Sequence, residues 1–221
     1  MDMAKIVPSK PFLLIFYGFP GSGKTYFARQ LADNIQLAHL QADRVRREIF
    51  DNPRYDKQEN SVVNHLMNYM TEEFLSAGVS VAYDVNALRT SQRKKLYDLA
   101  RKHKAQPVLI WLQVDQDTAY ARNIKRDKRK ADDRYAEGWD RSSFEQYISH
   151  MQNPANSENY IVVSGKHLFN MQQSAVVSRL RSTGIITQDE ANQHMTKPGM
   201  VNLIPNGGRF DASRRNISIR S

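Results

Sequence analysis

Gly18-Phe19-Pro20-Gly21-Ser22-Gly23-Lys24-Thr25 is the segment of this chain that says most about its fold. It fits the pattern G-x-x-x-x-G-K-[ST] of a phosphate-binding loop, the Walker A motif. An apolar run precedes it at residues 12–17, and a segment compatible with a helix follows it at residues 26–35. Strand, glycine loop and helix, in this order, are the context that the motif requires. The stretch therefore predicts a nucleoside-triphosphate site directly after the first strand.

Each residue type in this loop suits a triphosphate. Glycines let backbone N–H groups turn inward around an anion, and the helix that follows adds the positive end of its dipole. We expect Gly21, Ser22 and Gly23 to bind the phosphates of ATP in this way. Lys24 is the expected catalytic cation on the β- and γ-phosphates, and the Thr25 hydroxyl is an expected Mg²⁺ ligand. ATP and Mg²⁺ are therefore the predicted cofactors.

The rest of the chain alternates between apolar runs and helical patterns. We expect strands near residues 12–17, 37–40, 79–83, 107–114 and 161–163, with helices between them. This alternation predicts an α/β fold of the P-loop NTPase type. Its sheet is expected to be doubly wound and mostly parallel, with about five strands, helices on both faces and a helical lid.

Helix boundaries follow from spacing and caps. Apolar residues stand four apart over residues 58–77, which predicts one long helix there: Val62, Leu66, Met70 and Phe74. Thr90 and Ser142 are the expected N-caps of two later helices.

The length of 221 residues suits one α/β domain with an appendage. We place a P-loop domain at residues 1–182, with a charged lid at about 127–141, and a basic C-terminal extension at 183–221. Residues 185–190 are compatible with a strand or a short helix. Residues 216–220 alternate as an edge strand would, and a basic disordered tail is the competing interpretation.

Composition limits the class of protein. The net charge is +9, which favours nucleotides or nucleic acid as partners, although a merely soluble basic surface is an equal alternative. The chain has no cysteine, which excludes disulfides and Cys-based metal sites. Its apolar runs are too short to span a membrane, and no signal peptide follows the N-terminus. A soluble cytoplasmic protein is expected, and the six histidines show no metal-ligand spacing.

Asp43 and Arg46 stand three residues apart at the start of the second predicted helix, so they share one face. The preceding strand places that face at the carboxyl edge of the sheet, where open α/β sheets bind ligands. A kinase needs a group that accepts the proton of the acceptor hydroxyl, and Asp43 is the candidate. Arg46 is a candidate clamp on an acceptor phosphate. The alternative is an N-cap aspartate on a solvated charged helix.

Asp84 ends the third predicted strand, where a Walker B carboxylate lies close to Mg²⁺. Asn86 stands two residues further on and is expected on the same side, as part of a substrate site. An ordinary Asp-x-Asn turn is the alternative.

Arg122 and Arg126 are four residues apart on a helix that runs into the charged lid. An arginine on a mobile lid can stabilise the charge that develops on a transferring phosphoryl group. A solvated basic run is the commoner fate of such residues.

Together these residues resemble the polynucleotide kinase-like branch of P-loop kinases, with its AAA_33-type predicted kinases. The resemblance rests on four pieces in order, residues 18–25, 43–46, 84–86 and 122–126, and covers roughly residues 11 to 165. It implies a role for each matched position. Lys24 and Thr25 hold phosphates and Mg²⁺, Asp43 is the general base, Arg46 contacts the acceptor phosphate, Asp84 supports the metal or acceptor site, Arg126 is the lid arginine on the β- and γ-phosphates, Arg122 lies near the nucleotide and Gly165 lies by the adenine.

The predicted function is an ATP-dependent kinase acting on a hydroxyl, with the 5′-hydroxyl of a polynucleotide or a related nucleotide-type acceptor leading. A small-metabolite or nucleotide-sugar kinase, of the toxin-like kind, is one alternative. A nucleotide-gated, nucleic-acid-binding ATPase is another. The sequence leaves the acceptor and the oligomeric state open.

Overall fold

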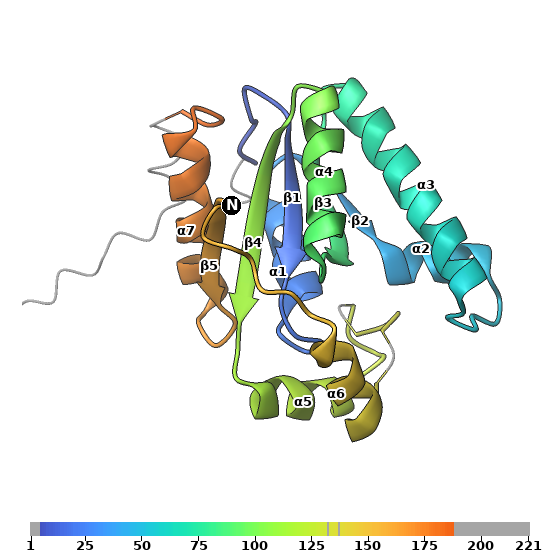
Figure 1. Ribbon diagram of the computed structural model, residues 1–221. Helices are drawn as coiled ribbons and strands as arrows, with labels where there is room; N and C mark the ends of the chain where they lie inside the picture. The colour runs from blue at the N-terminus through green and yellow to red at the C-terminus, as the bar shows by residue number, and fades with distance from the viewer. Residues whose placement is uncertain (1–4, 132, 137, 188–221) are drawn as a thin grey trace, which may run out of the picture.

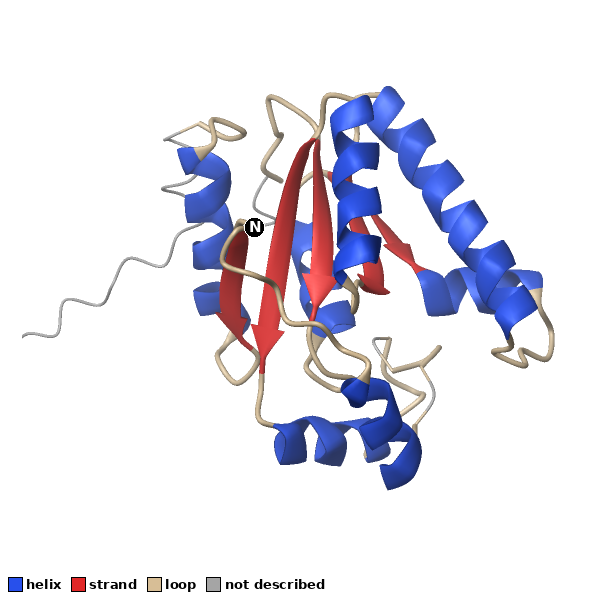
Figure 2. Cartoon of the chain, viewed as in Figure 1, coloured by secondary structure: helices blue, strands red, loops and turns tan. Residues whose placement is uncertain are grey.

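Five parallel strands form a single sheet (Figures 1 and 2). The computed structural model describes residues 5–131, 133–136 and 138–187. In sheet order β2-β3-β1-β4-β5, the strands are β2 (Leu37–Gln41), β3 (Ser80–Asn86), β1 (Phe12–Tyr17), β4 (Gln106–Gln113) and β5 (Tyr160–Ser164). Because every pairing is parallel, the carboxyl ends of the strands meet at one edge. The expected α/β fold with a parallel sheet of about five strands is confirmed.

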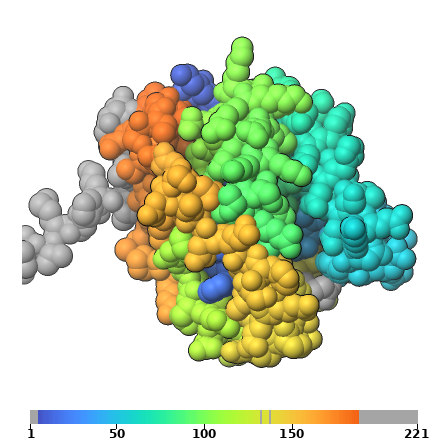
Figure 3. Space-filling view, in the orientation of Figure 1, coloured from blue at the N-terminus to red at the C-terminus, as the bar shows by residue number. Residues whose placement is uncertain are grey.

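Helices cover both faces of this sheet. They are α1 (Lys24–Asn34), α2 (Ala42–Ile49), α3 (Lys57–Ser76), α4 (Thr90–Lys102), α5 (Gln116–Ile124), α6 (Arg141–Ser149) and α7 (Phe169–Ser182). Helices α1 and α7 pack on one face. Helices α3 and α4 pack on the other, where they form the green and cyan surface in Figure 3.

Strand β1 is buried along its whole length because its side chains alternate between the two cores. One set packs with α1 and α7: Phe12, Leu14 and Phe16. The other set packs with α3 and α4: Leu13, Ile15 and Tyr17. This central position fixes the loop that follows β1 at the middle of the carboxyl edge.

The apolar repeat in α3 predicted the helix correctly, but its buried face is the neighbouring one. Val62 and Phe74 are 45% and 37% exposed. The buried residues of α3 are Glu59, Val63, Met67, Thr71 and Leu75. The hydroxyl of Thr71 donates to the carbonyl oxygen of Met67 at 2.7 Å, which satisfies a polar group inside the core. Because the buried face of α3 includes the polar residue Thr71, the neighbouring exposed face looks more apolar in the sequence.

The two expected N-caps are also wrong by one or two residues. Arg89 is the N-cap of α4, so Thr90 is its first residue. Asp140 caps α6, because its Oδ1 accepts from the backbone N–H of Ser143 at 2.8 Å. A carboxylate ahead of Ser142 thus takes the capping role that the hydroxyl was expected to fill.

The chain continues to pack onto the core after α7. Ile185 and Ile186 are buried beside α1 and α7, and the carbonyl oxygen of Ile185 accepts from the N–H of Ser9 at 2.9 Å. The core therefore includes residues beyond 182, and the described residues 183–187 form neither strand nor helix. The predicted alternation at 216–220 lies outside the described residues. No helix in the described part of the chain has the length and apolarity to cross a membrane.

Candidate functional site

A cleft of about 1480 Å³ opens at the carboxyl edge of the sheet. It is lined by the loop after β1, the start of α2, the end of β3 and part of α5. Every sequence-predicted site residue lies on its wall: Gly21, Ser22, Gly23, Lys24, Thr25, Asp43, Arg46, Asp84, Asn86, Arg122, Arg126 and Gly165. The fold thus gathers into one cavity residues that span more than half of the chain.

Two glycines allow the walls of this cleft to approach one another. Gly21 has φ +84°, and a Cβ there would overlap the carbonyl oxygen of Ala119 in α5. A Cβ on Gly165 would lie 2.6 Å from the carbonyl oxygen of Ser22. The end of β5 and α5 therefore lie against the phosphate-binding loop, and a side chain at either glycine would push them apart.

Lys24 is the central cation of the cleft. Its Nζ donates to the carbonyl oxygens of Gly18 at 2.9 Å and Phe19 at 2.8 Å. Burial lowers the pKa of Lys24 to about 8, against the attraction of Asp84 and Asp43 and with the repulsion of Arg126. Asp84, Asp43 and Arg126 therefore all lie close enough to Lys24 to act on its charge.

Asp84 lies at the end of β3 with its side chain only 5% exposed. His39 Nε2 is 3.1 Å from its Oδ2. Sequence reasoning missed His39, since it looked only for metal-ligand spacing. The available signal was its place on the strand that precedes Asp43, because neighbouring parallel strands bring such residues together.

The residues present fit a magnesium ion. Thr25 offers a hydroxyl oxygen and Asp84 a carboxylate oxygen on the same cavity wall, and Mg²⁺ prefers such oxygen ligands. No group of three or more His, Cys, Asp or Glu suited to a metal occurs among the described residues.

Asn86 links the phosphate-binding loop to α6. Its Oδ1 accepts from the backbone N–H of Gly18 at 3.3 Å, and its Nδ2 donates to the Tyr147 hydroxyl oxygen at 2.9 Å. Burial raises the pKa of Tyr147 to about 12, so its hydroxyl stays protonated at neutral pH. Trp139 packs on the Tyr147 ring with the ring centroids 4.8 Å apart. Sequence reasoning missed both aromatic residues, since they stand far from every motif.

Arg122 and Arg126 both line the cleft. Arg122 lies in α5, and Arg126 lies two residues after the end of that helix. The Nη1 of Arg122 donates to the carbonyl oxygen of Gly165 at 2.9 Å. Arg126 lies within electrostatic reach of Lys24. The described residues between α5 and α6 form turns, bends and irregular backbone, so the expectation of a helical lid is wrong for this segment, which is a loop between two helices.

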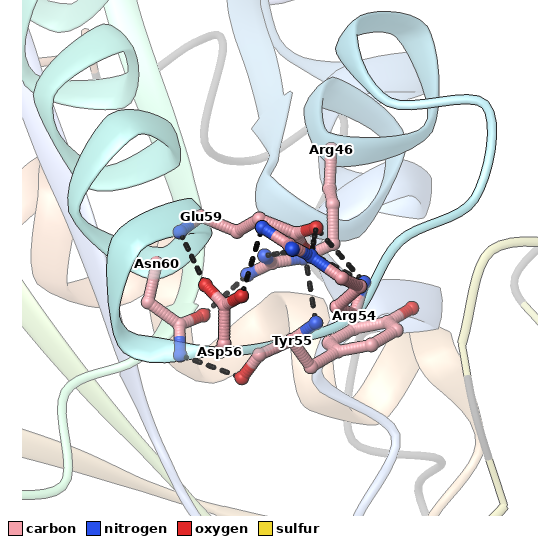
Figure 4. A network of polar contacts seen from close by, with 6 residues as sticks. All are labelled: Arg46, Arg54, Tyr55, Asp56, Glu59 and Asn60. Carbon is pink, nitrogen blue, oxygen red and sulfur yellow. Dashed lines mark hydrogen bonds and ion pairs between the residues drawn. The ribbon is translucent and has the colours of Figure 1, made fainter.

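Arg46 is engaged by groups of the protein itself (Figure 4). Its side chain is 7% exposed, and its Nη1 lies 3.3 Å from Glu59 Oε2. Its Nη2 donates to Asn60 Oδ1 at 2.6 Å, and its guanidinium lies 4.6 Å from the centroid of the Tyr55 ring. The residue expected to clamp an acceptor phosphate thus already has a counterion.

Comparison with known proteins agrees with this geometry. A family model described as "AAA domain" matches residues 13–154. No curated protein is significantly similar to the chain in sequence.

Solved structures share the fold at low sequence identity. Kti12 of Chaetomium thermophilum, in complex with ADP-AlF3, has a TM-score of 0.60 at 15% identity and covers 79% of this chain and 100% of its own. A gluconokinase from Sinorhizobium meliloti 1021 has a TM-score of 0.57 at 14% identity, covering 79% and 94%. The Mycobacterium tuberculosis APS kinase CysC, in complex with AMPPNP and APS, has a TM-score of 0.57 at 15% identity, covering 78% and 99%. At such identities the likeness establishes the fold.

Proposed function

The chain belongs to the AAA domain family whose model it matches over residues 13–154, and we propose that it is an ATP-dependent kinase acting on a hydroxyl group. The observation that carries the proposal is the convergence of Lys24, Asp43, Asp84 and Arg126 on one cleft. A nucleotide-binding loop alone is compatible with many activities. Phosphoryl transfer needs more than the loop: a base, a carboxylate near the metal position and a lid arginine accompany it here.

In the proposed mechanism the loop and Lys24 bind the β- and γ-phosphates of ATP. Asp43 takes the proton of the acceptor hydroxyl while the hydroxyl oxygen bonds to the γ-phosphorus. The bond between that phosphorus and the β–γ bridging oxygen breaks in the same step, and ADP leaves. Arg126 stabilises the charge on the transferring group. A magnesium ion held by Thr25 and Asp84 would neutralise phosphate charge. Catalysis is then mainly positioning and charge stabilisation.

For the acceptor we propose the 5′-hydroxyl of a polynucleotide or a related nucleotide-type molecule. The net charge of +9 and the resemblance to polynucleotide kinases support this class. A small-metabolite kinase is the second candidate, since a gluconokinase and an APS kinase are among the structures that share the fold. Fold alone does not choose between them.

Acceptor dependence tests the proposal. The full chain is incubated with ATP, Mg²⁺ and a panel of 5′-hydroxyl oligonucleotides, nucleosides, nucleotide-sugars and sugars, and ATP consumption is measured with and without each. A kinase consumes ATP much faster with its acceptor and yields a phosphorylated product. A nucleotide-gated binding protein would instead hydrolyse ATP slowly at one rate throughout and bind nucleic acid in a salt-dependent manner.

A further inference from the structure

The acceptor half of the cleft is the part lined by α2, the start of α3, the end of β3, the start of α4 and the pair Trp139 and Tyr147. Among the described residues of these elements that line the cleft, Arg46 is the only cation. Whether this half attracts an anionic group therefore depends on whether the charge of Arg46 is already balanced by a counterion of the protein.

The charge of Arg46 is balanced inside the protein (Figure 4). Glu59 lies 3.3 Å from its Nη1 and is itself only 4% exposed. Arg54 pairs with the same Glu59 at 3.4 Å and with Asp56 at 3.0 Å. Two guanidinium groups thus face two carboxylates, and the cluster has no net charge.

Glu59 is held in its charged form and in one position. Burial acts to raise its pKa, but the backbone N–H groups of Arg54 and Tyr55, each 2.9 Å away, outweigh this and lower the pKa below its ordinary value. Asp56 caps α3 by accepting from the N–H of Glu59 at 2.9 Å. The counterion of Arg46 is therefore part of a folded helix start and not a loose surface contact.

The remaining lining of this half consists of aromatic rings and amides. Tyr55 packs one face on Arg46 and is 36% exposed, and Trp139 and Tyr147 pack against each other. Asn60, Asn64 and Gln92 add amide groups. Aromatic faces stack on nucleobases, and amides hydrogen-bond to base edges, whereas phosphate recognition uses cations that are free to pair.

We propose that this half recognises its acceptor as an uncharged nucleoside unit, with the 5′-hydroxyl toward Asp43, and that Glu59 sets this selectivity by neutralising Arg46. The inference rests on the proposed kinase function and narrows its acceptor. A phosphate on the 3′ side of the acceptor then gains little affinity from Arg46. Glu59 acts through Arg46 and is a positioning residue.

The test measures binding without turnover. The full chain is saturated with a non-hydrolysable ATP analogue and Mg²⁺, and the four deoxynucleosides and their 3′-monophosphates are titrated by calorimetry. In the wild type, the dissociation constants of a nucleoside and its 3′-monophosphate are expected to agree within about threefold. In Glu59→Gln the monophosphate is expected to bind about tenfold or more tighter than its nucleoside, since a charge-assisted hydrogen bond becomes available. Glu59→Asp keeps the charge and is expected to keep the wild-type ratio.

Two further arms complete the test. A short oligothymidylate with a 5′-hydroxyl shows whether the nucleoside unit comes from a strand end, because its 3′ phosphodiester is expected to add little in the wild type. The double variant Glu59→Gln with Arg46→Gln is expected to lose the gain of the single variant. A loss of folding would lower binding of both members of a pair and leave their ratio unchanged.

Three results would overturn the inference. The wild type binds the 3′-monophosphates at least tenfold tighter than the nucleosides, none of the nucleosides binds, or a folded Glu59→Gln variant keeps the wild-type ratio. If Glu59→Gln does not fold, the inference is tested by the ratio of the two affinities, monophosphate to nucleoside, in the wild type alone. Because phosphoryl transfer is assayed separately, failure of the proposed kinase activity is seen as absent product and not as a changed binding ratio.

Discussion

The proposed donor half of the cleft comprises residues 18–25 with Arg122, Arg126 and Gly165. It differs from the proposed acceptor half in whether its central cation has a carboxylate counterion within the protein. In the donor half Lys24 is half-buried and donates to backbone carbonyl oxygens, and its burial disfavours its charge. In the acceptor half Arg46 is paired with Glu59. A bound polyanion in the donor half would therefore stabilise the charged form of Lys24, which burial disfavours. The acceptor half is complete without an anion.

The strongest test of this division replaces Asp43, where the two halves meet. Asp43→Ala is expected to lower the rate of phosphoryl transfer by about 10⁴, the upper range for general-base catalysis, with an unchanged dissociation constant for ATP. Transfer rate and ATP affinity are measured on the same sample. Asp51→Ala, at an exposed position, is the matched control and is expected to behave as the wild type. Transfer by Asp43→Ala at the wild-type rate would remove Asp43 from the mechanism.

Replacement of Arg126, the proposed lid arginine, is expected to have the next largest effect. Arg126→Ala is expected to lower turnover by roughly 10³, because it removes a cation from the developing charge of the transition state. Arg129→Ala is the control, since its side chain is 91% exposed and pairs with Asp127 in the same segment. Steady-state kinetics at saturating ATP compare the two. Near-normal turnover in Arg126→Ala would show that the donor half works without a lid cation.

The framework beneath the acceptor half is tested through stability. Arg93 is fully buried and binds Glu158 through two nitrogens, at 2.6 and 2.8 Å, and the carbonyl oxygens of Ala87 and Gln152. Arg93→Met leaves a carboxylate without its partner and is expected to cost about 3–5 kcal/mol in the free energy of unfolding. Urea denaturation measures this.

The exposed pair of Arg101 and Asp98 is the control for that variant. Arg101→Ala is expected to cost under about 1 kcal/mol, because a surface pair contributes little. Equal losses in Arg93→Met and Arg101→Ala would show that the buried network does not hold this half together.

The smallest expected effect is a pH dependence of nucleotide binding. With a pKa of about 8 in the free protein, Lys24 is neutral in roughly three quarters of the molecules at pH 8.5. Bound phosphates favour its charged form and raise its pKa, so binding takes up ~0.7 proton at pH 8.5, and affinity falls as the pH rises above 8. Calorimetry in buffers of different ionisation enthalpy measures the uptake. Lys24→Arg stays charged and is expected to show none; equal uptake in both proteins would contradict the account of Lys24.

The two halves also differ in how far the sequence predicts them. The phosphate-binding loop of the donor half, residues 18–25, is one contiguous motif between a strand and a helix, so local pattern was sufficient to predict it. The acceptor half depends on contacts between distant segments. Glu59 is 13 residues from Arg46, Tyr147 is 61 residues from Asn86, and Glu158 is 65 residues from Arg93. No local periodicity links such pairs, and only the folded chain brings them together.

Smaller errors have the same origin. The buried stripe of α3 includes Thr71, whose hydroxyl is satisfied by a backbone carbonyl that the sequence does not display. His39 lies against Asp84 only because β2 and β3 are neighbours in the sheet. Strand order and buried hydrogen bonds are tertiary properties, and a pattern read along one segment does not contain them.

The most direct test of the central claim follows the γ-phosphate through a single turnover. The full chain, in excess over γ-labelled ATP, is mixed with Mg²⁺ and a 5′-hydroxyl nucleoside or oligonucleotide, and the products are separated. The wild type is expected to transfer the label to the acceptor hydroxyl, whereas Asp43→Ala is expected to bind ATP with the same affinity and to leave the label in it. Release of the label as inorganic phosphate, at one rate with and without acceptor, would rule out the proposed phosphoryl transfer.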